Sequence, residues 1–306
     1  MPSIKTIAIL GAGAMGGAYG AMLATAPQLE TMFVARGARA ARLAQEGLAV
    51  NGRPLHLPVV TPEQATNPVD LVMVALKHHH LQTALPDLDP FVGEETTIVS
   101  VMNGLESEET IGARFGREKV LPAVAVGLDA LREGNRVAYR SPGQLVFGER
   151  RNAGISPRVQ RIQEAFSRAG IPFETPEDMQ RALWWKFMVN VGMNQASAVM
   201  RAPYGLFQAS EDARALMEAL MREVIALAEV SDIDLAEKDI ADWLAVLPSL
   251  APDGKTSMLQ DIEAGRPTEV AMFAGKVVAM GRDLGVATPV NAALLHIIRV
   301  LTQESI

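Results

Sequence analysis

A lysine and two asparagines recur at every fourth position of a largely apolar segment, residues 184–194. On a helix Lys186, Asn190 and Asn194 would lie within about 80° of one another and line one face. Burying such groups without partners is costly, so the stripe predicts a pocket in which apolar neighbours lower the lysine pKa. That lysine could protonate the oxyanion formed from a ketone while the asparagines hold substrate oxygens. The alternative is an amphipathic helix whose narrow polar face meets water.

A glycine-rich segment near the start of the chain has a spacing that binds phosphates. It follows the apolar run Ile4–Leu10 directly and opens a predicted helix, which is the context that the G-x-G-x-x-G pattern requires. The first glycine permits a tight turn, the second lets a pyrophosphate approach the backbone, and the third lets helix and strand pack closely. The helix N-terminus offers N–H groups to the anion. The residues that we interpret as a dinucleotide-binding loop, rather than a purely structural turn, are Gly11, Ala12, Gly13, Ala14, Met15 and Gly16.

The residue after the second predicted strand favours NADP over NAD. A site for NAD usually has Asp or Glu about 20 residues beyond the glycines, where the carboxylate holds the ribose 2′-hydroxyl. Here Arg36 stands in that place and Arg39 follows. A guanidinium pairs with a 2′-phosphate that a carboxylate would repel, although a solvated surface arginine is the alternative interpretation. Lys77 and Asn103 follow two further predicted strands, whose carboxyl ends are where such sheets bind ligands.

These residues need a scaffold of alternating strands and helices. Apolar runs separated by helical stretches predict βαβ units and a parallel sheet. The predicted strands are 4–10, 31–35, 69–76, 97–101 and 120–126, with a hairpin at 48–60, an antiparallel pair of 136–139 with 144–147, and an edge strand at 171–175. Helices are predicted beyond residue 178, at 179–198, 210–231, 236–247, 257–264, 269–284 and 290–302. The expected fold is an α/β Rossmann-like NADP-binding domain with a mostly parallel sheet at 1–175 and an all-α substrate and catalytic domain at 176–306.

Composition limits the classes of partner. The 306 residues carry 28 Lys+Arg against 35 Asp+Glu, a net charge of −7, which argues against general nucleic-acid binding. No cysteine is present, so disulfides and thiolate chemistry are excluded and a cytoplasmic location is expected. The uncharged stretch 7–26 mimics a membrane span, but its glycines argue against one. Histidines 78–80 would point in different directions on a helix, so no metal site is expected.

Several segments together carry a family resemblance. They are the GAGAMG loop at 11–16, Arg36, Lys77 after VMVAL, Asn103-Gly104, LREGN at 131–135, the lysine–asparagine stripe, SMLQD at 257–261 and PTE at 267–269. In these segments the chain resembles the ketopantoate reductase (2-dehydropantoate 2-reductase) family. The resemblance implies NADPH-dependent reduction of 2-dehydropantoate to pantoate, a step towards pantothenate and coenzyme A. The implied partner is a small 2-oxo acid, and assembly into a homodimer is compatible with it.

The resemblance also implies roles by position. Lys186 would be the general acid. The residues that would contact substrate are Asn103, Asn190, Asn194 and Ser257. The residues that would hold the cofactor are Gly11 to Gly16, Arg36, Lys77, Asn103, the backbone near Ala130, and Glu269. From the residues alone, Glu269 is equally an ordinary first-turn acid that complements a helix dipole.

Two positions depart from the family pattern. Gln195 stands where members often have proline, and Tyr204 stands before Gly205 where a substrate-side asparagine is common. The pocket can therefore be shaped for another 2-oxo acid. The remaining alternatives are a nicotinamide dehydrogenase of 3-hydroxyacid or opine type and a non-catalytic NADP(H)-binding regulator.

Overall fold

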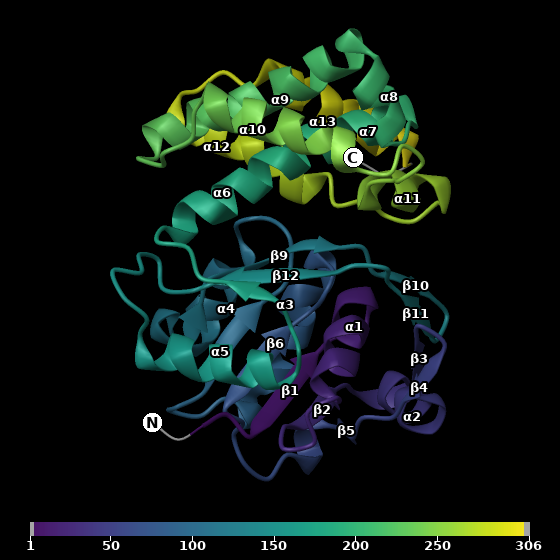
Figure 1. The fold of residues 1–306 in the computed structure, drawn as a ribbon, viewed down its shortest axis with the longest axis vertical. Helices are drawn as coiled ribbons and strands as arrows, with labels where there is room; N and C mark the ends of the chain where they lie inside the picture. Colours follow the sequence, from purple (N-terminus) through teal and green to yellow (C-terminus); the bar gives the residue numbers. More distant parts are fainter. Residues whose placement is uncertain (1–2, 303–306) are drawn as a thin grey trace. The chain divides into compact units, whose positions relative to one another are not determined.

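The computed structural model describes residues 3–302, and the chain divides into two compact units, Met1–Met179 and Gln180–Ile306. Figure 1 shows strands and helices in the first unit and helices alone in the described part of the second. This parallel α/β unit followed by a helical unit confirms the predicted fold class. None of the helices within residues 3–302 combines the length and the apolar character that crossing a bilayer requires.

A six-stranded parallel sheet forms the centre of the first unit. In spatial order its strands are β5 (Val59–Val60), β2 (Glu30–Val34), β1 (Thr6–Leu10), β6 (Leu71–Val74), β7 (Thr97–Ser100) and β8 (Val120–Leu121). The strands β2 and β5 lie on one side of β1, and the later strands β6, β7 and β8 lie on its other side. The strand order therefore reverses beside β1, and doubly wound sheets bind ligands at such a switch point.

Side chains of β1 alternate between two cores, one on each face of the sheet. Ile7 and Ile9 belong to one core, and Ala8 and Leu10 belong to the other. The first core receives side chains from α1 (Ala14–Leu23), α5 (Pro157–Arg168) and, through Leu43, the helix 37–46, and the second receives them from α3 (Leu81–Ala84) and α4 (Ser107–Phe115). Because successive strand residues point to opposite faces, a strand covered on both sides must be apolar throughout.

Two smaller sheets complete the unit. Their orders are β10 (Leu131–Glu133), β11 (Arg136–Ala138), β3 (Leu48–Val50), β4 (Arg53–Leu55), and β13 (Phe173–Glu174), β12 (Pro142–Phe147), β9 (Ala123–Leu128). The strand β3 follows α2 (Gly37–Glu46) directly and pairs in parallel with β11. This pairing carries the β10–β11 hairpin to the region of α2, although the two segments are far apart in the sequence.

The prediction of one strand over 120–126 is wrong. Pro122 separates β8, in the large sheet, from β9, in a small one. Proline has no N–H to donate to a ladder, so the chain leaves one sheet and enters another at this residue.

The predicted pairing of 136–139 with 144–147 is also wrong. The strand β11 pairs with β10 and β3, whereas β12 pairs with β9 and β13. Gly134, with φ of +61°, lies in the turn between β10 and β11, whereas Pro142 and Gly143, between the two predicted segments, lie within β12. Of the predicted hairpin at 48–60, β3 and β4 are confirmed, but Val59–Val60 joins the large sheet.

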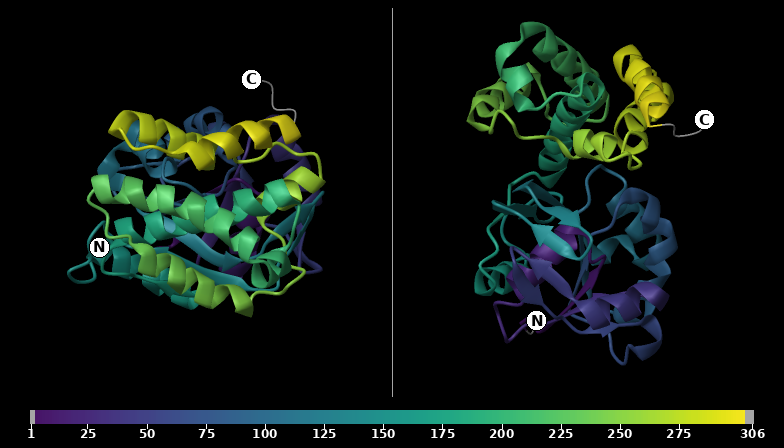
Figure 2. Two further views of the ribbon diagram at one scale, coloured as in Figure 1. Left: turned by 90° about the horizontal axis from the view of Figure 1, so that it is seen from above. Right: turned by 90° about the vertical axis from the view of Figure 1, so that its right-hand side faces the viewer.

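The second unit contains helices arranged about α9 (Glu211–Val230). The others are α6 (Met179–Val189), α7 (Gln195–Met200), α8 (Tyr204–Ala209), α10 (Glu237–Val246), α11 (Ser257–Glu263), α12 (Lys276–Leu284) and α13 (Pro289–Leu301). Figure 2 shows α9, α12 and α13 packed side by side. The helix α8 begins at Tyr204, where the sequence predicts only a break. The sequence also does not predict the two π-helical turns Asn190–Asn194 and Ala271–Gly275.

Candidate functional site

The glycine-rich loop joins β1 to α1 and has open space beside its second glycine. Gly11 has φ of +108°, and a Cβ there would lie 2.4 Å from the main-chain oxygen of Ala75. A Cβ on Gly16 would lie 1.8 Å from the oxygen of Gly11, so this helix and loop approach too closely for any side chain. A Cβ on Gly13 would have only that Ala75 oxygen nearby, at 3.9 Å, and no side chain caps α1 there. The loop therefore fits a pyrophosphate at Gly13 and the helix N-terminus.

Three further predicted residues follow strands that neighbour the loop. Arg36 comes after β2, Lys77 after β6 and Asn103 after β7. Because these strands are parallel and adjacent to β1 or to one another, their carboxyl ends share one edge of the sheet. Lys77 is exposed and Asn103 is half-buried. The fold therefore brings these residues to the edge that carries the glycine-rich loop.

Arg36 forms an ion pair that its position in the sequence does not predict. Its Nε lies 2.5 Å from Oδ1 of Asp87, and its Nη2 lies 3.9 Å from Oε1 of Glu63. Burial raises the pKa of the Asp87 carboxyl, whereas the charge of Arg36 lowers it. The positive charge of Arg36 is consequently shared with two carboxylates.

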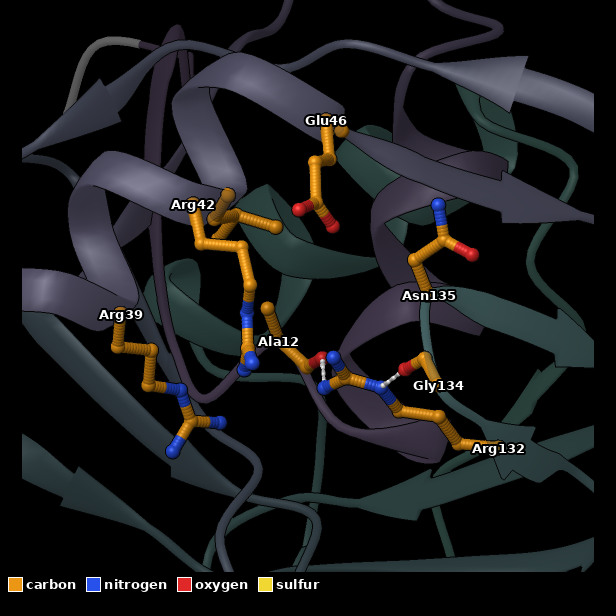
Figure 3. A pocket seen from close by; sticks show the side chains of 9 residues that line it. Ala12, Arg39, Arg42, Glu46, Arg132, Gly134 and Asn135 are labelled. Atoms are coloured by element: carbon orange, nitrogen blue, oxygen red, sulfur yellow. Dashed lines mark hydrogen bonds between the residues drawn. The ribbon is translucent and has the colours of Figure 1, made fainter.

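Beside the loop, three arginines surround a hollow of about 270 Å³. In Figure 3, Arg39 and Arg42 extend from α2 and Arg132 from β10, and their guanidinium groups point towards the same space. Nη1 of Arg132 donates to the main-chain oxygen of Ala12, and its Nε donates to that of Gly134 at 2.8 Å. Partial burial lowers the pKa of the Arg132 guanidinium, and the charges of Arg39 and Arg42 lower it further.

The sequence does not indicate that Arg42 and Arg132 belong to one site. No spacing signal could have linked them, because the pairing of β11 with β3 brings their segments together. Ala130, which the resemblance assigns to the cofactor, lies directly before β10 and packs against the first core.

In the helical unit, Lys186, Asn190 and Asn194 lie along one continuous stretch of helix. Asn190 and Asn194 are 5% and 9% exposed, so they do not face water as the alternative interpretation required, and Lys186 is half-buried. Desolvation by the surrounding side chains lowers the pKa of the Lys186 ammonium. In an α-helix, side chains four residues apart are rotated relative to one another by about 40° about the helix axis. The wider π turn from Asn190 to Asn194 reduces the rotation that accumulates along the stripe. Such π turns occur frequently at functional sites.

Ser257 reaches the neighbourhood of this stripe through its helix. It is the exposed first residue of α11, and α11 packs against α7 and the π turn Asn190–Asn194. Thr256 holds the start of α11 because its Oγ1 accepts from the Leu259 N–H at 3.2 Å and donates to Ser197 Oγ at 3.2 Å. The cap therefore anchors Ser257 to the helix that follows the stripe.

Glu269 lies just outside the helix that the sequence predicts it to start. The helical stretch begins with the π turn Ala271–Gly275, and the main-chain oxygen of half-buried Glu269 accepts from the Met272 N–H at 3.0 Å. The same oxygen also accepts from the Phe273 N–H at 3.2 Å, so Glu269 lies at the N-terminal boundary of this helical stretch.

The two departures from the family pattern lie in different environments. The buried Gln195 donates through Nε2 to the oxygens of Val191, at 2.8 Å, and Asn291, at 3.0 Å, and its Oε1 accepts from the Ala274 N–H at 3.1 Å. These bonds join the two π turns to α13. Tyr204 is half-buried at the start of α8, and burial raises its pKa.

Comparisons with known proteins agree with both units. Residues 7–152 match the model for "Ketopantoate reductase PanE/ApbA", and residues 178–302 match the one for its C-terminal part. A 2-dehydropantoate 2-reductase of Mesorhizobium japonicum is 31% identical, over 97% of this chain and 98% of its own. The crystal structure of a 2-dehydropantoate 2-reductase from Geobacter metallireducens is 31% identical with a TM-score of 0.85, covering 98% of this chain and 100% of its own. A complex of D-mandelate dehydrogenase with NADH has a TM-score of 0.87 at 23% identity, covering 98% and 99%, and shows a shared fold only.

Proposed function

The chain belongs to the ketopantoate reductase family, and from this we propose that it reduces 2-dehydropantoate to pantoate with NADPH, a step towards pantothenate and coenzyme A. The observation that carries the proposal is the placement of Lys186, with its lowered pKa, on one stripe with two buried asparagines. We also propose that residues 1–175 act as the NADP-binding domain and residues 176–306 as the substrate and catalytic domain.

The cofactor assignment rests on the shape and charge of the first unit. The residues that would hold NADP(H) are Gly11, Ala12, Gly13, Ala14, Met15, Gly16, Arg36, Lys77, Asn103, the backbone near Ala130, and Glu269 of the helical unit. The open space at Gly13 suits a pyrophosphate. At Gly11 and Gly16, main-chain atoms of neighbouring segments occupy the place of a Cβ, so the loop can pack closely against the sheet. The residues that directly follow β2 in the sequence are Ala35 and Arg36, where a site for NAD usually has an aspartate or glutamate.

The chemistry divides between hydride delivery and proton donation. When bound, the reduced nicotinamide supplies the hydride that converts the C2 carbonyl of the substrate to an alcohol. Lys186 would donate the proton to the carbonyl oxygen as negative charge develops there. Its lowered pKa suits this role because an acid works best when its pKa lies near the operating pH. Asn103, Asn190, Asn194 and Ser257 would hold the substrate oxygens and fix the orientation of the carbonyl.

The identity of the 2-oxo acid depends more on Tyr204 than on Gln195. The Gln195 amide is engaged within the helical core, so its departure from proline has a structural explanation. Tyr204 is half-buried, and its departure from the asparagine of the family has no comparable structural explanation. A reductase of another 2-oxo acid is therefore the second candidate, since a shared fold does not fix the substrate.

The test is NADPH oxidation by the purified protein with a panel of 2-oxo acids that includes 2-dehydropantoate. We expect the largest kcat/KM with 2-dehydropantoate. A larger value with another member of the panel would favour the second candidate. Tight NADPH binding without turnover of any member would contradict the enzymatic proposal and indicate a binding protein.

A further inference from the structure

The hollow beside the glycine-rich loop carries an excess of positive charge. Arg39, Arg42 and Arg132 line it, and Glu46 is the one acidic residue among its lining. Arg39 and Arg42 are exposed, and within residues 3–302 neither forms a salt bridge. The three guanidinium groups line one hollow and repel one another; burial lowers the pKa of Arg132 most, and the charges of Arg39 and Arg42 lower it further. Such an arrangement is stabilised by an anion that enters between the guanidinium groups.

Main-chain acceptors hold Arg132 in position for this role. Its Nη1 donates to the Ala12 oxygen, and its Nε donates to the Gly134 oxygen. These two bonds fix the plane of the guanidinium and tie it to the glycine-rich loop. Arg39 and Arg42 lie three residues apart on α2, so their side chains leave the same face of that helix. The anion site is therefore built from one fixed cation and two adjustable ones.

Arg36 offers a weaker electrostatic environment for a phosphate than this hollow does. Its guanidinium lies 2.5 Å from the Asp87 carboxylate, with Glu63 at 3.9 Å. A phosphate dianion at Arg36 would have to approach two carboxylates, and like charges at short range are unfavourable. The hollow presents three cations against one carboxylate.

We propose that Arg39, Arg42 and Arg132 supply most of the charge that binds the adenosine 2′-phosphate of NADP(H), and that Arg36 contributes less to this site because its charge is shared with Asp87. The inference rests on the proposed cofactor. A pyrophosphate at Gly13 accounts for one anionic group of the ligand, and the hollow reaches the same loop at Ala12. NADP differs from NAD by a second anionic group on the adenosine ribose, and the hollow supplies the charge that this group requires.

The test measures binding rather than turnover. Dissociation constants for NADPH, NADH, 2′,5′-ADP, 5′-AMP and inorganic phosphate are obtained by calorimetry for the full chain and for R39A, R42A and R132Q. A hydrogen bond to a charged group contributes substantially to the binding free energy. Each substitution should therefore raise the dissociation constants for NADPH and 2′,5′-ADP by roughly tenfold or more. Binding of NADH and 5′-AMP should change by less than about twofold, because neither carries the 2′-phosphate. Inorganic phosphate that bound as tightly as 2′,5′-ADP would overturn the proposal by indicating a general anion site.

One matched variant serves as a control, and a second compares Arg36 with the three arginines of the hollow. R136A removes an exposed arginine from the same hairpin, outside the hollow, and should leave all the dissociation constants unchanged. R36A should reduce the preference for NADPH less than R42A does. The proposal is overturned if R36A alone abolishes the preference while R39A and R42A retain it, or if NADPH and NADH weaken in parallel.

The proposed function is tested separately by the wild-type protein. Failure to reduce any 2-oxo acid, with the 2′-phosphate preference still lost in R42A, would refute the reductase and leave the anion site standing. Turnover of 2-dehydropantoate with unchanged binding in the three variants would refute the anion site alone.

Discussion

Glu223 and Asn291 are joined inside the helical unit by a hydrogen bond of 2.7 Å from the Asn291 amide to the Glu223 carboxylate. The same carboxylate accepts from the main-chain N–H groups of Val290, at 2.7 Å, and Asn291, at 2.9 Å. Glu223 on α9 therefore caps the first turn of α13, where a negative charge also complements the helix dipole. Oδ1 of Asn291 in turn accepts from Gln195 Nε2. This hydrogen-bond network therefore extends from α9 and α13 to the helical stretch that bears the lysine–asparagine stripe.

We expect E223A to lower the free energy of unfolding by about 3 kcal/mol or more, because three donors lose a charged acceptor in a buried site. Urea unfolding followed by circular dichroism, without cofactor, measures this change. E229A removes an exposed carboxylate from the same helix and should alter stability by no more than about 0.5 kcal/mol. Equal effects of the two substitutions would contradict the capping role.

Removal of the Lys186 amine should separate catalysis from cofactor binding. We expect K186A to lose about 10²- to 10⁴-fold in kcat, the range that a general acid supplies, while its dissociation constant for NADPH stays within a few fold of wild type. Stopped-flow NADPH oxidation and fluorescence titration measure the two quantities. K238A, which removes an exposed lysine from α10, should match wild type in both. Near-normal turnover by K186A would remove Lys186 from the mechanism.

The direction of the Lys186 pKa shift gives a pH dependence. Reduction needs the protonated ammonium, so the single-turnover rate should fall as pH rises through its pKa. Because burial lowers that pKa, the fall should begin at a lower pH than for an exposed lysine. K186R keeps its charge across this range, so its residual rate should lack the alkaline limb. An identical limb in K186R would assign the titration to another group.

The sequence predicts the parts of this fold that local patterns determine. The glycine spacing and the apolar run of β1 predict the turn between β1 and α1, because Gly11 and Gly16 lie where a Cβ would collide with main-chain oxygens. The lysine–asparagine spacing located a helix with buried polar side chains. The π turn at Asn190–Asn194 was missed because the same sequence spacing fits an α-helix.

Contacts between distant segments could not be predicted from spacing. The sequence offers no cue that β11 pairs with β3, and that pairing alone brings Arg132 to α2 and the loop. The partner of Arg36 was missed for the same reason, since Asp87 lies in a 3₁₀ segment, Leu85–Phe91, that no pattern connects to β2. Charge at a site depends on such partners as much as on the residue itself.

The Arg36–Asp87 pair should make stability depend on pH. R36A leaves the mostly buried Asp87 carboxylate without its nearest cation, which raises the pKa of Asp87 further. A folded-state pKa above the unfolded value means that the penalty is present at neutral pH and disappears as pH falls through it. R36A should therefore cost roughly 1 kcal/mol at pH 7 and less near pH 4.

Urea unfolding at both pH values, for wild type, R36A, D87N and the double variant, isolates the pair. The coupling free energy should be larger at pH 7 than near pH 4. A coupling that did not change with pH would show that the carboxylate remains charged throughout and that its burial has little effect on folding.

Two glycines of the phosphate loop should respond in opposite ways to the same substitution. At Gly13 a side chain would enter open space where the pyrophosphate is proposed to approach, and its φ of −78° suits any residue. G13V should therefore weaken binding of NADPH and NADH alike, by roughly tenfold or more, with little change in thermal stability. At Gly16 a Cβ would collide with the Gly11 oxygen, so G16V should lower the melting temperature in the absence of any cofactor. Calorimetric titration and thermal unfolding of both variants distinguish the two effects, and a G13V protein that bound both nucleotides normally would place the pyrophosphate elsewhere.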